Sequence, residues 1–293
     1  MATYAAKGDR FEDQTIRQAS IKNEVGTSGD TRGLSPDLWA GCPIEQYKSN
    51  PEVGMYFFDD LIDGIDVAAN QATAAVSALG TTGVFTGATD ATAGTTISTL
   101  ATNRKGAVVL ASTTDNESAM IAWPKGAAVS GPVQFSSGKK VWMEARVQVN
   151  SIADSIAQLY VGFAEEALVA GGSLLLINEA GLADKDYLGF VREYADGDKL
   201  NTNFNTASGG ASPVSNSNAA TLEAATWTKI GIYSDGTTVK FYQDGVELSG
   251  AFLLSATDFP VDQEMAFYAE CMCGAAGTDA SMTIDWIAIA QEY

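Results

Sequence analysis

The carboxylate side chains in strand-like segments are the residues of this sequence best suited to chemistry. A retaining glycosidase needs two of them, an acid and a nucleophile, about 5–5.5 Å apart. Glu144 stands alone in VWMEARV, whereas Glu165 and Glu166 are adjacent and would point to opposite faces of a strand. Glu264 and Glu270 are six positions apart, which permits one face but is too far for a pair within one strand. The spacing therefore disfavours a glycosidase.

Other catalytic arrangements are limited by the complete absence of histidine. Without it neither a Ser-His-Asp triad nor a Cys-His pair can form. The three cysteines, Cys42, Cys271 and Cys273, are too few for a disulfide framework, and one must stay unpaired. No further ligands suit a metal site around Cys271 and Cys273, so we predict that both are small core residues. The sequence predicts no catalytic residue, no metal site and no cofactor.

Two groups of residues could still bind a ligand. ADGDKLNTN offers oxygen atoms of Asp196, Asp198 and Asn201 to Ca²⁺, but Asp-Gly is common in turns, and we predict a solvated polar turn. Aromatic side chains that could stack on a sugar ring, or equally pack in the core, are Trp142, Tyr160, Tyr187, Tyr194, Tyr233 and Tyr242.

The elements that must position these residues are strands. In KKVWMEARVQVNSI, apolar residues alternate with polar ones from Val141 to Val149, which predicts a half-buried strand. WTKIGIYSDGTTVKFYQDGVEL predicts antiparallel partners around Asp235-Gly236 and a second tight turn at Asp244-Gly245. The polar residues 199–223 predict a long exposed loop with at most one edge strand. About ten strand candidates follow residue 105 without a convincing helix, which indicates a two-sheet antiparallel sandwich.

The first 55 residues differ from the rest in composition. Residues 10–24 favour at most a short helix, and in residues 25–54 Gly, Pro, Ser and Asp recur too often for a regular element. Large apolar side chains nevertheless stand in this segment, which we predict to be an extended arm that lies across another surface. The predicted contact residues are Phe11, Ile16, Ile21, Trp39 and Tyr47. That surface is either a partner protein or a neighbouring subunit, or else the arm's own domain.

The charge is strongly acidic, with 17 basic and 36 acidic residues and a net charge of −19. Such a body repels phosphate, so nucleic acid and anionic membranes are poor partners. The N-terminus lacks the apolar core of a signal peptide, and no apolar run reaches the length of about 18 residues that a membrane span needs. We expect a soluble protein made in a cytoplasm.

The order WMEARVQV, YVGFAEE, YLGFVREY, WTKIGIYSDGTTVKFYQDGVEL and MTIDWIAIAQEY resembles the concanavalin A-like lectin/glucanase jelly roll, over about residues 105–293. The resemblance implies an all-β jelly-roll sandwich. Its hydrolases carry a strand of the form E-x-D-x-x-E, which this sequence lacks. Its lectins bind metals partly through histidine, so that their metal site cannot be transferred in full.

The combination of an arm with an acidic jelly roll rich in Gly, Ala, Thr and Ser also resembles decoration proteins of tailed-bacteriophage heads. This resemblance implies a structural virion protein on the outer capsid surface, commonly a homotrimer, that clamps the major capsid protein. The alternative is a carbohydrate-binding jelly roll on a phage head or tail appendage, with a glycan as partner. We predict an arm at 1–55 and a sandwich at 56–293, in which residues 56–105 either join the sheets or form a peripheral subdomain.

Overall fold

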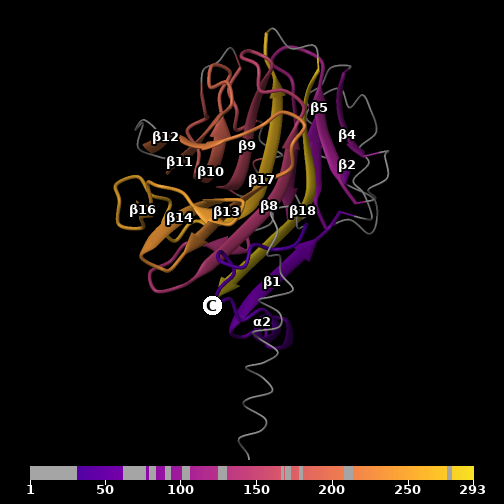
Figure 1. Ribbon diagram of the computed structural model, residues 1–293. Coiled ribbons are helices and arrows are strands. Elements are labelled where there is room, and N and C mark those ends of the chain that lie inside the picture. The colour runs from indigo at the N-terminus through magenta and orange to yellow at the C-terminus, as the bar shows by residue number, and fades with distance from the viewer. Residues whose placement is uncertain are drawn as a thin grey trace, which may run out of the picture.

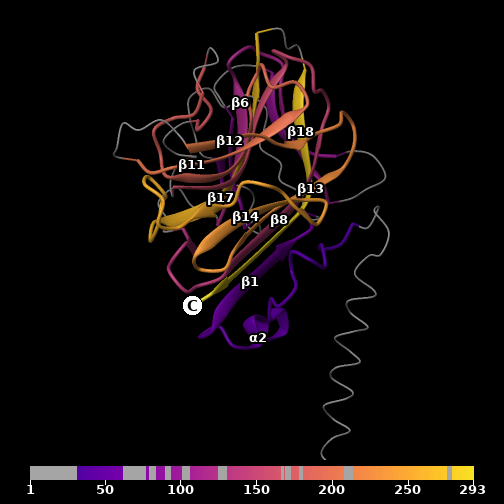
Figure 2. The same ribbon diagram turned by 60° about the vertical axis from the view of Figure 1, so that its left-hand side comes forward.

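The computed structural model describes residues 32–61, 77–78, 84–89, 94–100, 106–124, 131–165, 168, 173–177, 181–207, 214–275 and 279–293. These residues form two antiparallel sheets that enclose one apolar core (Figures 1 and 2). The prediction of an all-β, two-sheet antiparallel jelly-roll sandwich is confirmed.

Sheet A has the strand order β15-β14-β13-β8-β18-β5-β4, and in addition β1 pairs with β18 and β16 with β14. Its strands are β1 (Gly54–Asp59), β4 (Thr95–Thr99), β5 (Val108–Ser112), β8 (Val141–Val149), β13 (Thr228–Ser234), β14 (Thr238–Gln243), β15 (Val246–Glu247), β16 (Phe252–Leu253) and β18 (Ala280–Glu292).

Sheet B has the strand order β12-β11-β10-β9-β17-β6-β3-β2, with β7 paired to β17. Its strands are β2 (Ser77–Ala78), β3 (Thr86–Thr89), β6 (Ser118–Trp123), β7 (Val133–Gln134), β9 (Ala157–Glu165), β10 (Tyr187–Arg192), β11 (Lys199–Asn205), β12 (Val214–Thr221) and β17 (Glu264–Cys273). Helix α2 (Ile44–Ser49) precedes β1.

Strand β8 shows how the alternation in the sequence builds the core. Val141, Met143 and Val147 point into the apolar interior between the sheets. The opposite face was predicted to meet water, yet Trp142 and Glu144 on that face are buried as well. The strand is therefore buried on both sides, because another part of the chain covers the outer face of sheet A.

The two Asp-Gly turns lie where the sequence predicts them. Strands β13 and β14 form a hairpin whose last pair is Ser234 and Val239, and Gly236 between them has a φ of +85°. At the next turn Asp244 and Gly245 both have positive φ, and the chain returns into β15. Glycine adopts this left-handed backbone at no steric cost, which explains the residue choice.

The polar residues 199–223 differ from the prediction of a loop with at most one edge strand. Both β11 and β12 lie in this stretch, and they pair with each other at the edge of sheet B. In β11, Leu200 and Phe204 point into the core, while the asparagines between them point outward. The asparagine amides are hydrogen-bonded, so this strand tolerates a composition that by itself favours loops.

The strands described between residues 56 and 105 are hydrogen-bonded into the main sheets. β2 and β3 extend sheet B beyond β6, and β4 extends sheet A beyond β5. Their small Thr, Gly and Ala residues form short strands, as the composition predicts.

Residues 32–53, which we call the strap, lie against the end of sheet A that carries β1 and the C-terminus (indigo in Figures 1 and 2). Most of the strap consists of turns, but α2 is regular, which the sequence did not predict. The chain then enters β1, which pairs with the second half of β18 from Gly54–Glu292 to Asp59–Ile287. The strap is thus continuous with the sheet of its own subunit.

Candidate functional site

The outer face of sheet A is occupied by the strap. Leu38, Trp39 and Tyr47 are buried there in one apolar cluster with sheet residues, namely Trp142, Tyr242, Trp286, Ala288 and Ala290. Tyr47 and Trp142 are neighbours, with ring centroids 6.3 Å apart. This aromatic surface is therefore filled by the chain itself.

Glu144 of β8 connects the strap to the sheet. One of its oxygens, Oε2, accepts a hydrogen bond from the backbone N–H of Ser35 at 2.9 Å and another from Trp39 Nε1 at 2.8 Å. Burial raises the pKa of Glu144, while the hydrogen bonds from the strap oppose that rise. The carboxylate that stood alone in the sequence serves as an acceptor for the strap.

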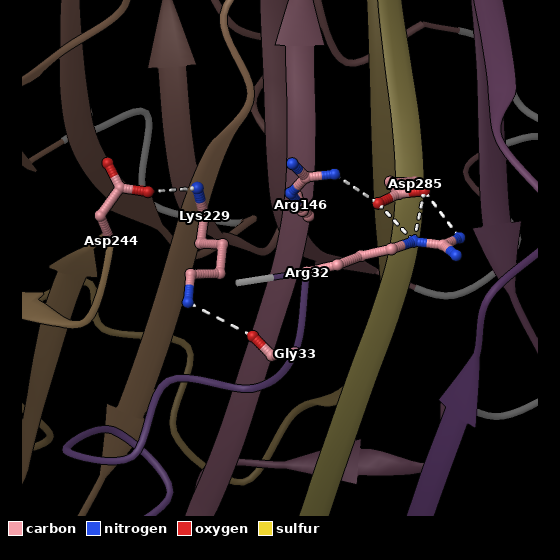
Figure 3. Close-up of polar contacts among 6 residues, drawn as sticks. All are labelled: Arg32, Gly33, Arg146, Lys229, Asp244 and Asp285. Atoms are coloured by element: carbon pink, nitrogen blue, oxygen red, sulfur yellow. Dashed lines mark hydrogen bonds and ion pairs between the residues drawn. The ribbon is translucent and has the colours of Figure 1, made fainter. Parts of the chain in front are cut away.

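A buried charge cluster lies beside it on the same face (Figure 3). Asp285 is fully buried and accepts hydrogen bonds from Arg146 Nη1 at 2.6 Å and from Arg32 Nε at 2.9 Å. The strand register shifts between Ile284 and Trp286, which marks a β-bulge at Asp285. A bulge re-aims a side chain, and here both Asp285 and Trp286 meet partners on the outer face.

Lys229 of β13 forms the second part of this cluster. Its backbone N–H donates to Asp244 at 2.9 Å, and its ammonium donates to the carbonyl of Gly33 at 3.3 Å. Arg146 also stacks on Trp227, with its guanidinium carbon 4.6 Å from the ring centroid. The charged groups of this face hold the strap and one another.

Gly231 of β13 tests whether the strap is specifically fitted to the sheet. A Cβ at this position would lie 2.4 Å from Cδ2 of Leu38, so Gly231→Ala must displace that side chain. We expect the variant to lose about 1–3 kcal/mol of unfolding free energy, the usual cost of overpacking a buried contact. Urea denaturation followed by tryptophan fluorescence measures this loss.

Gly33 provides the matched control within the strap. A Cβ there meets nothing within 4 Å, so Gly33→Ala should leave the unfolding free energy within about 0.5 kcal/mol of the wild type. Equal stability of the two variants would show that the strap does not need the contact between Leu38 and Gly231.

The outer face of sheet B is covered by a different segment, which includes Leu168, residues 173–177 and residues 181–183. Glu270 of β17 is fully buried beneath it. Its Oε2 accepts hydrogen bonds from the backbone N–H groups of Leu174 at 3.0 Å and Leu175 at 3.2 Å, and from the hydroxyl of Tyr268 at 2.9 Å. Ser173 Oγ donates to the other oxygen. Burial raises the pKa of Glu270 to about 6 against these hydrogen bonds.

Tyrosines line the same face. Tyr160 lies over two glycines, because a Cβ at Gly189 would come within 2.7 Å of its hydroxyl oxygen and one at Gly162 within 3.1 Å. Its hydroxyl donates to the carbonyl of Phe163 at 2.7 Å. The ring of Tyr187 packs edge-on against it, with centroids 6.1 Å apart. The packing of Tyr160 is thus complete.

Tyr187 differs from Tyr160. It stands opposite Asn205 in the register of β10 and β11, and both side chains are buried. Neither the hydroxyl of Tyr187 nor Oδ1 of Asn205 has a hydrogen-bond partner in the part of the chain that the structure describes. An unpaired polar atom that is shut off from water costs about 1–3 kcal/mol. Two of them on one cross-strand pair suggest a missing partner.

The surroundings of this pair are polar, and we call residues 184–187 together with Asn205 and Thr206 the β10–β11 corner. Asn205 Nδ2 donates to Asp184 Oδ1 and to the carbonyl of Lys185, both at 3.0 Å. Asp186 Oδ1 accepts from Thr206 Oγ1 at 2.7 Å. Asp184 is exposed, so the corner extends to the solvent on the side of the Asn205 amide nitrogen.

The predicted arm residues fall into two groups. Trp39 and Tyr47 are buried against the sheet of their own chain. Phe11, Ile16 and Ile21 lie outside the described residues. Attachment to a major capsid protein, assembly as a homotrimer and a place on the outer surface of a virion stay predictions.

The aromatic candidates for sugar stacking are mostly inside. Trp142, Tyr160, Tyr187, Tyr194 and Tyr242 are buried, and Tyr233 is half-buried. The five buried rings offer no open stacking surface, and Tyr187 is the one described tyrosine whose hydroxyl is both buried and unpaired. Sequence reasoning missed its partner Asn205, although the alternation in LNTNFN was a signal for it.

The predicted polar turn accounts for the three residues considered for Ca²⁺. Asp196 accepts hydrogen bonds from the N–H of Glu193 and from Asn201, and Asp198 pairs with Lys199. Within the described residues, no group of three or more Asp, Glu or Cys is placed to hold a metal ion. Nor does any helix described here have the length and apolarity to cross a bilayer.

The cysteines behave as predicted, since Cys271 and Cys273 are buried in the apolar core. Burial raises the pKa of Cys271 well above that of an ordinary thiol, which keeps it protonated and unreactive. A cavity of about 10 Å³ between the sheets is lined by apolar residues such as Val161, Phe190 and Ile230 and is too small for a ligand.

The comparisons with known proteins concern the fold. No family model matches the sequence, and no curated protein does either. The carbohydrate recognition domain of Emp47p is similar in structure, with a TM-score of 0.48, 13% identity, and coverage of 82% of this chain and 95% of that domain.

Two bacterial structures are similar at the same level. A protein of unknown function from Shewanella oneidensis MR-1 has a TM-score of 0.45 and 14% identity over 100% of this chain and 96% of its own. A glycoside hydrolase family protein from Mycobacterium thermorestibile has a TM-score of 0.43 and 17% identity over 63% of this chain and 76% of its own. At this distance the likenesses carry no argument about function.

Proposed function

We propose that this chain is a non-catalytic carbohydrate-binding β-sandwich whose ligand docks at the β10–β11 corner. The observation that carries the proposal is the pair of unpaired buried polar atoms on Tyr187 and Asn205. A phenol and an amide side by side can hydrogen-bond the hydroxyl groups of a sugar. Contacts from such a ligand would offset the cost of leaving the two atoms unpaired.

The placement of the carboxylates supports binding rather than hydrolysis. Glu144 and Glu270 lie on the outer faces of opposite sheets, so the two cannot act on one bond. Glu144, Asp285 and Glu270 are each engaged by hydrogen bonds from the chain itself. Glycoside hydrolysis needs an acid and a second carboxylate that both reach the substrate.

A glycan array followed by calorimetric titration of the strongest ligands tests the proposal. We expect binding of at least one glycan class and no release of reducing sugar over hours of incubation with it. Failure of every glycan to bind would overturn the proposal, and steady release of reducing ends would overturn its non-catalytic part.

Tyr187→Phe gives a prediction in which stability and binding change in opposite directions. Removing an unpaired buried hydroxyl should leave the free protein as stable as the wild type or up to about 1 kcal/mol more stable. The glycan found above should bind about ten- to a hundredfold more weakly, because a sugar hydroxyl loses its partner. Thermal unfolding and calorimetry measure the two effects.

Tyr160→Phe is the matched control. Its hydroxyl is bonded within the protein, so the loss should cost about 0.5–1.5 kcal/mol of stability and leave the affinity unchanged. If Tyr187→Phe destabilised the free protein as much as Tyr160→Phe does, the Tyr187 hydroxyl would have a partner within the chain, and the site would be refuted.

A further inference from the structure

The orientation of the Asn205 amide fixes what a ligand must offer. Both hydrogens of Nδ2 are used, one toward Asp184 Oδ1 and one toward the carbonyl of Lys185. The oxygen Oδ1 has no hydrogen-bond partner among the described residues, and it can only accept a hydrogen bond. A ligand atom placed there must be a donor.

The charged groups around Asn205 also favour a ligand that donates hydrogen bonds. Asp184 and Asp186 lie within the corner, and Glu165 of β9 accepts from the N–H of Asp186 at 3.4 Å. Lys185 is the one cation of the corner, and its ammonium pairs with Glu165 at 2.7 Å. Three carboxylates against one ammonium leave the corner negative, in a protein whose net charge is −19.

We infer that the corner selects a sugar that donates hydrogen bonds and carries no negative charge, that is, a neutral or amine-bearing pyranose rather than a uronic, sialic or sulfated one. This inference rests on the proposed function. A hydroxyl or ammonium group supplies the donor that Asn205 lacks. An acidic sugar would bring its carboxylate toward Asp184 and Asp186, and like charges within a few ångströms repel strongly at a half-buried site.

A metal ion is the other ligand that a group of oxygen acceptors suggests. Hydrogen-bond donors of the protein, however, already stand among the oxygens here. The donors are Asn205 Nδ2, Thr206 Oγ1 and the N–H of Ala207. A Ca²⁺ site needs six to eight oxygen ligands around the ion. Here the oxygen atoms already accept hydrogen bonds from these donors, which favours a hydrogen-bonding ligand over a metal ion.

The test uses the full chain and sugars matched in ring configuration: glucose, glucosamine and glucuronate, with the corresponding galactose and mannose series. Affinities are measured by NMR titration at low salt, where charge is least screened. In the series that binds, we expect the neutral sugar and the amine to bind at least tenfold tighter than the uronate. The double variant Asp184→Asn, Asp186→Asn should narrow this difference in affinity to less than threefold, because it removes two negative charges. The structure of the corner should persist, since each amide oxygen can keep the existing hydrogen bonds.

Asp115→Asn with Asp279→Asn is the control of equal charge. Both residues are exposed and lie at the opposite end of β9 from the corner, so this variant should keep the full gap. Equal binding of uronate and neutral sugar by the wild type would overturn the inference and leave the proposed function standing. Absence of any sugar binding would overturn the proposed function itself. A rise in the melting temperature with Ca²⁺ alone, without sugar binding, would replace both with a metal site.

Discussion

Asp285→Ala is expected to lower the free energy of unfolding by about 3–5 kcal/mol, the cost of leaving a buried charge without its partner. Asp285 is fully buried, and the Arg146 side chain bonded to it is only 5% exposed. Without the carboxylate, Arg146 keeps its stacking on Trp227 but has no anion in contact among the described residues. Urea denaturation at pH 7 measures the change.

Arg32→Ala measures how much of the stabilisation around Asp285 comes from the strap. Arg32 bonds the same carboxylate but is 44% exposed, so its removal should cost about 1 kcal/mol or less. In this variant Arg146 and Asp285 still compensate each other. Equal destabilisation by the two substitutions would contradict this prediction. It would mean that the exposed ion pair of Arg32 with Asp285 contributes more stability than the buried pair of Arg146 with Asp285.

Glu270 gives the second large effect, and two substitutions of similar size should differ sharply. Glu270→Leu leaves the N–H groups of Leu174 and Leu175 without an acceptor, at about 1–3 kcal/mol each. Glu270→Gln can keep the hydrogen bonds with Leu174, Leu175 and Ser173. Its oxygen accepts from both N–H groups, and its amide donates to Ser173 Oγ, whose own proton goes to the carbonyl of Leu175. We expect near wild-type stability for Gln at pH 7, as measured in urea.

The pH dependence of the Gln variant provides a separate check. Burial raises the pKa of Glu270 from 4.5 to about 6, so the folded protein holds this proton more tightly than the unfolded chain. The stability from this group is present below pH 4.5 and is lost as pH rises toward 6, by about 2 kcal/mol in total. From about pH 3.5 to about pH 7 the wild type should lose that much free energy of unfolding relative to Glu270→Gln. Parallel stability curves of the two proteins would contradict the raised pKa.

The two-sheet fold could be predicted because local patterns specify it. Alternation defines β8, and the Asp-Gly pairs define the turns around β14. The strand β11 could not be predicted in the same way, since LNTNFN has the composition of a loop. Its asparagines are acceptable in a strand only because distant groups bond them, for example Asp184 twenty-one positions earlier.

The covered faces were harder still to predict. An outer face with Glu144 and Arg146 reads as solvent-exposed, and nothing in the alternation says that residues a hundred positions earlier lie on it. The signals were Trp142 on the polar face and Gly231 at a mid-strand position of β13. The unpaired atoms of the β10–β11 corner depend on the register of β10 and β11 and follow from no single segment.

The pairing of β1 with β18 has a mechanical consequence. Gly54 faces Glu292, and the N–H of Tyr293 donates to the carbonyl of Val53, so the strand that follows the strap and the chain end meet at one edge. Tension between residue 32 and Tyr293 would therefore load this pair from one end. Its hydrogen bonds would then break one after another from the Gly54–Glu292 end, instead of bearing the force together in shear. Once the contacts of the strap with sheet A have broken, the β1–β18 pair would be the next part of the sandwich to separate.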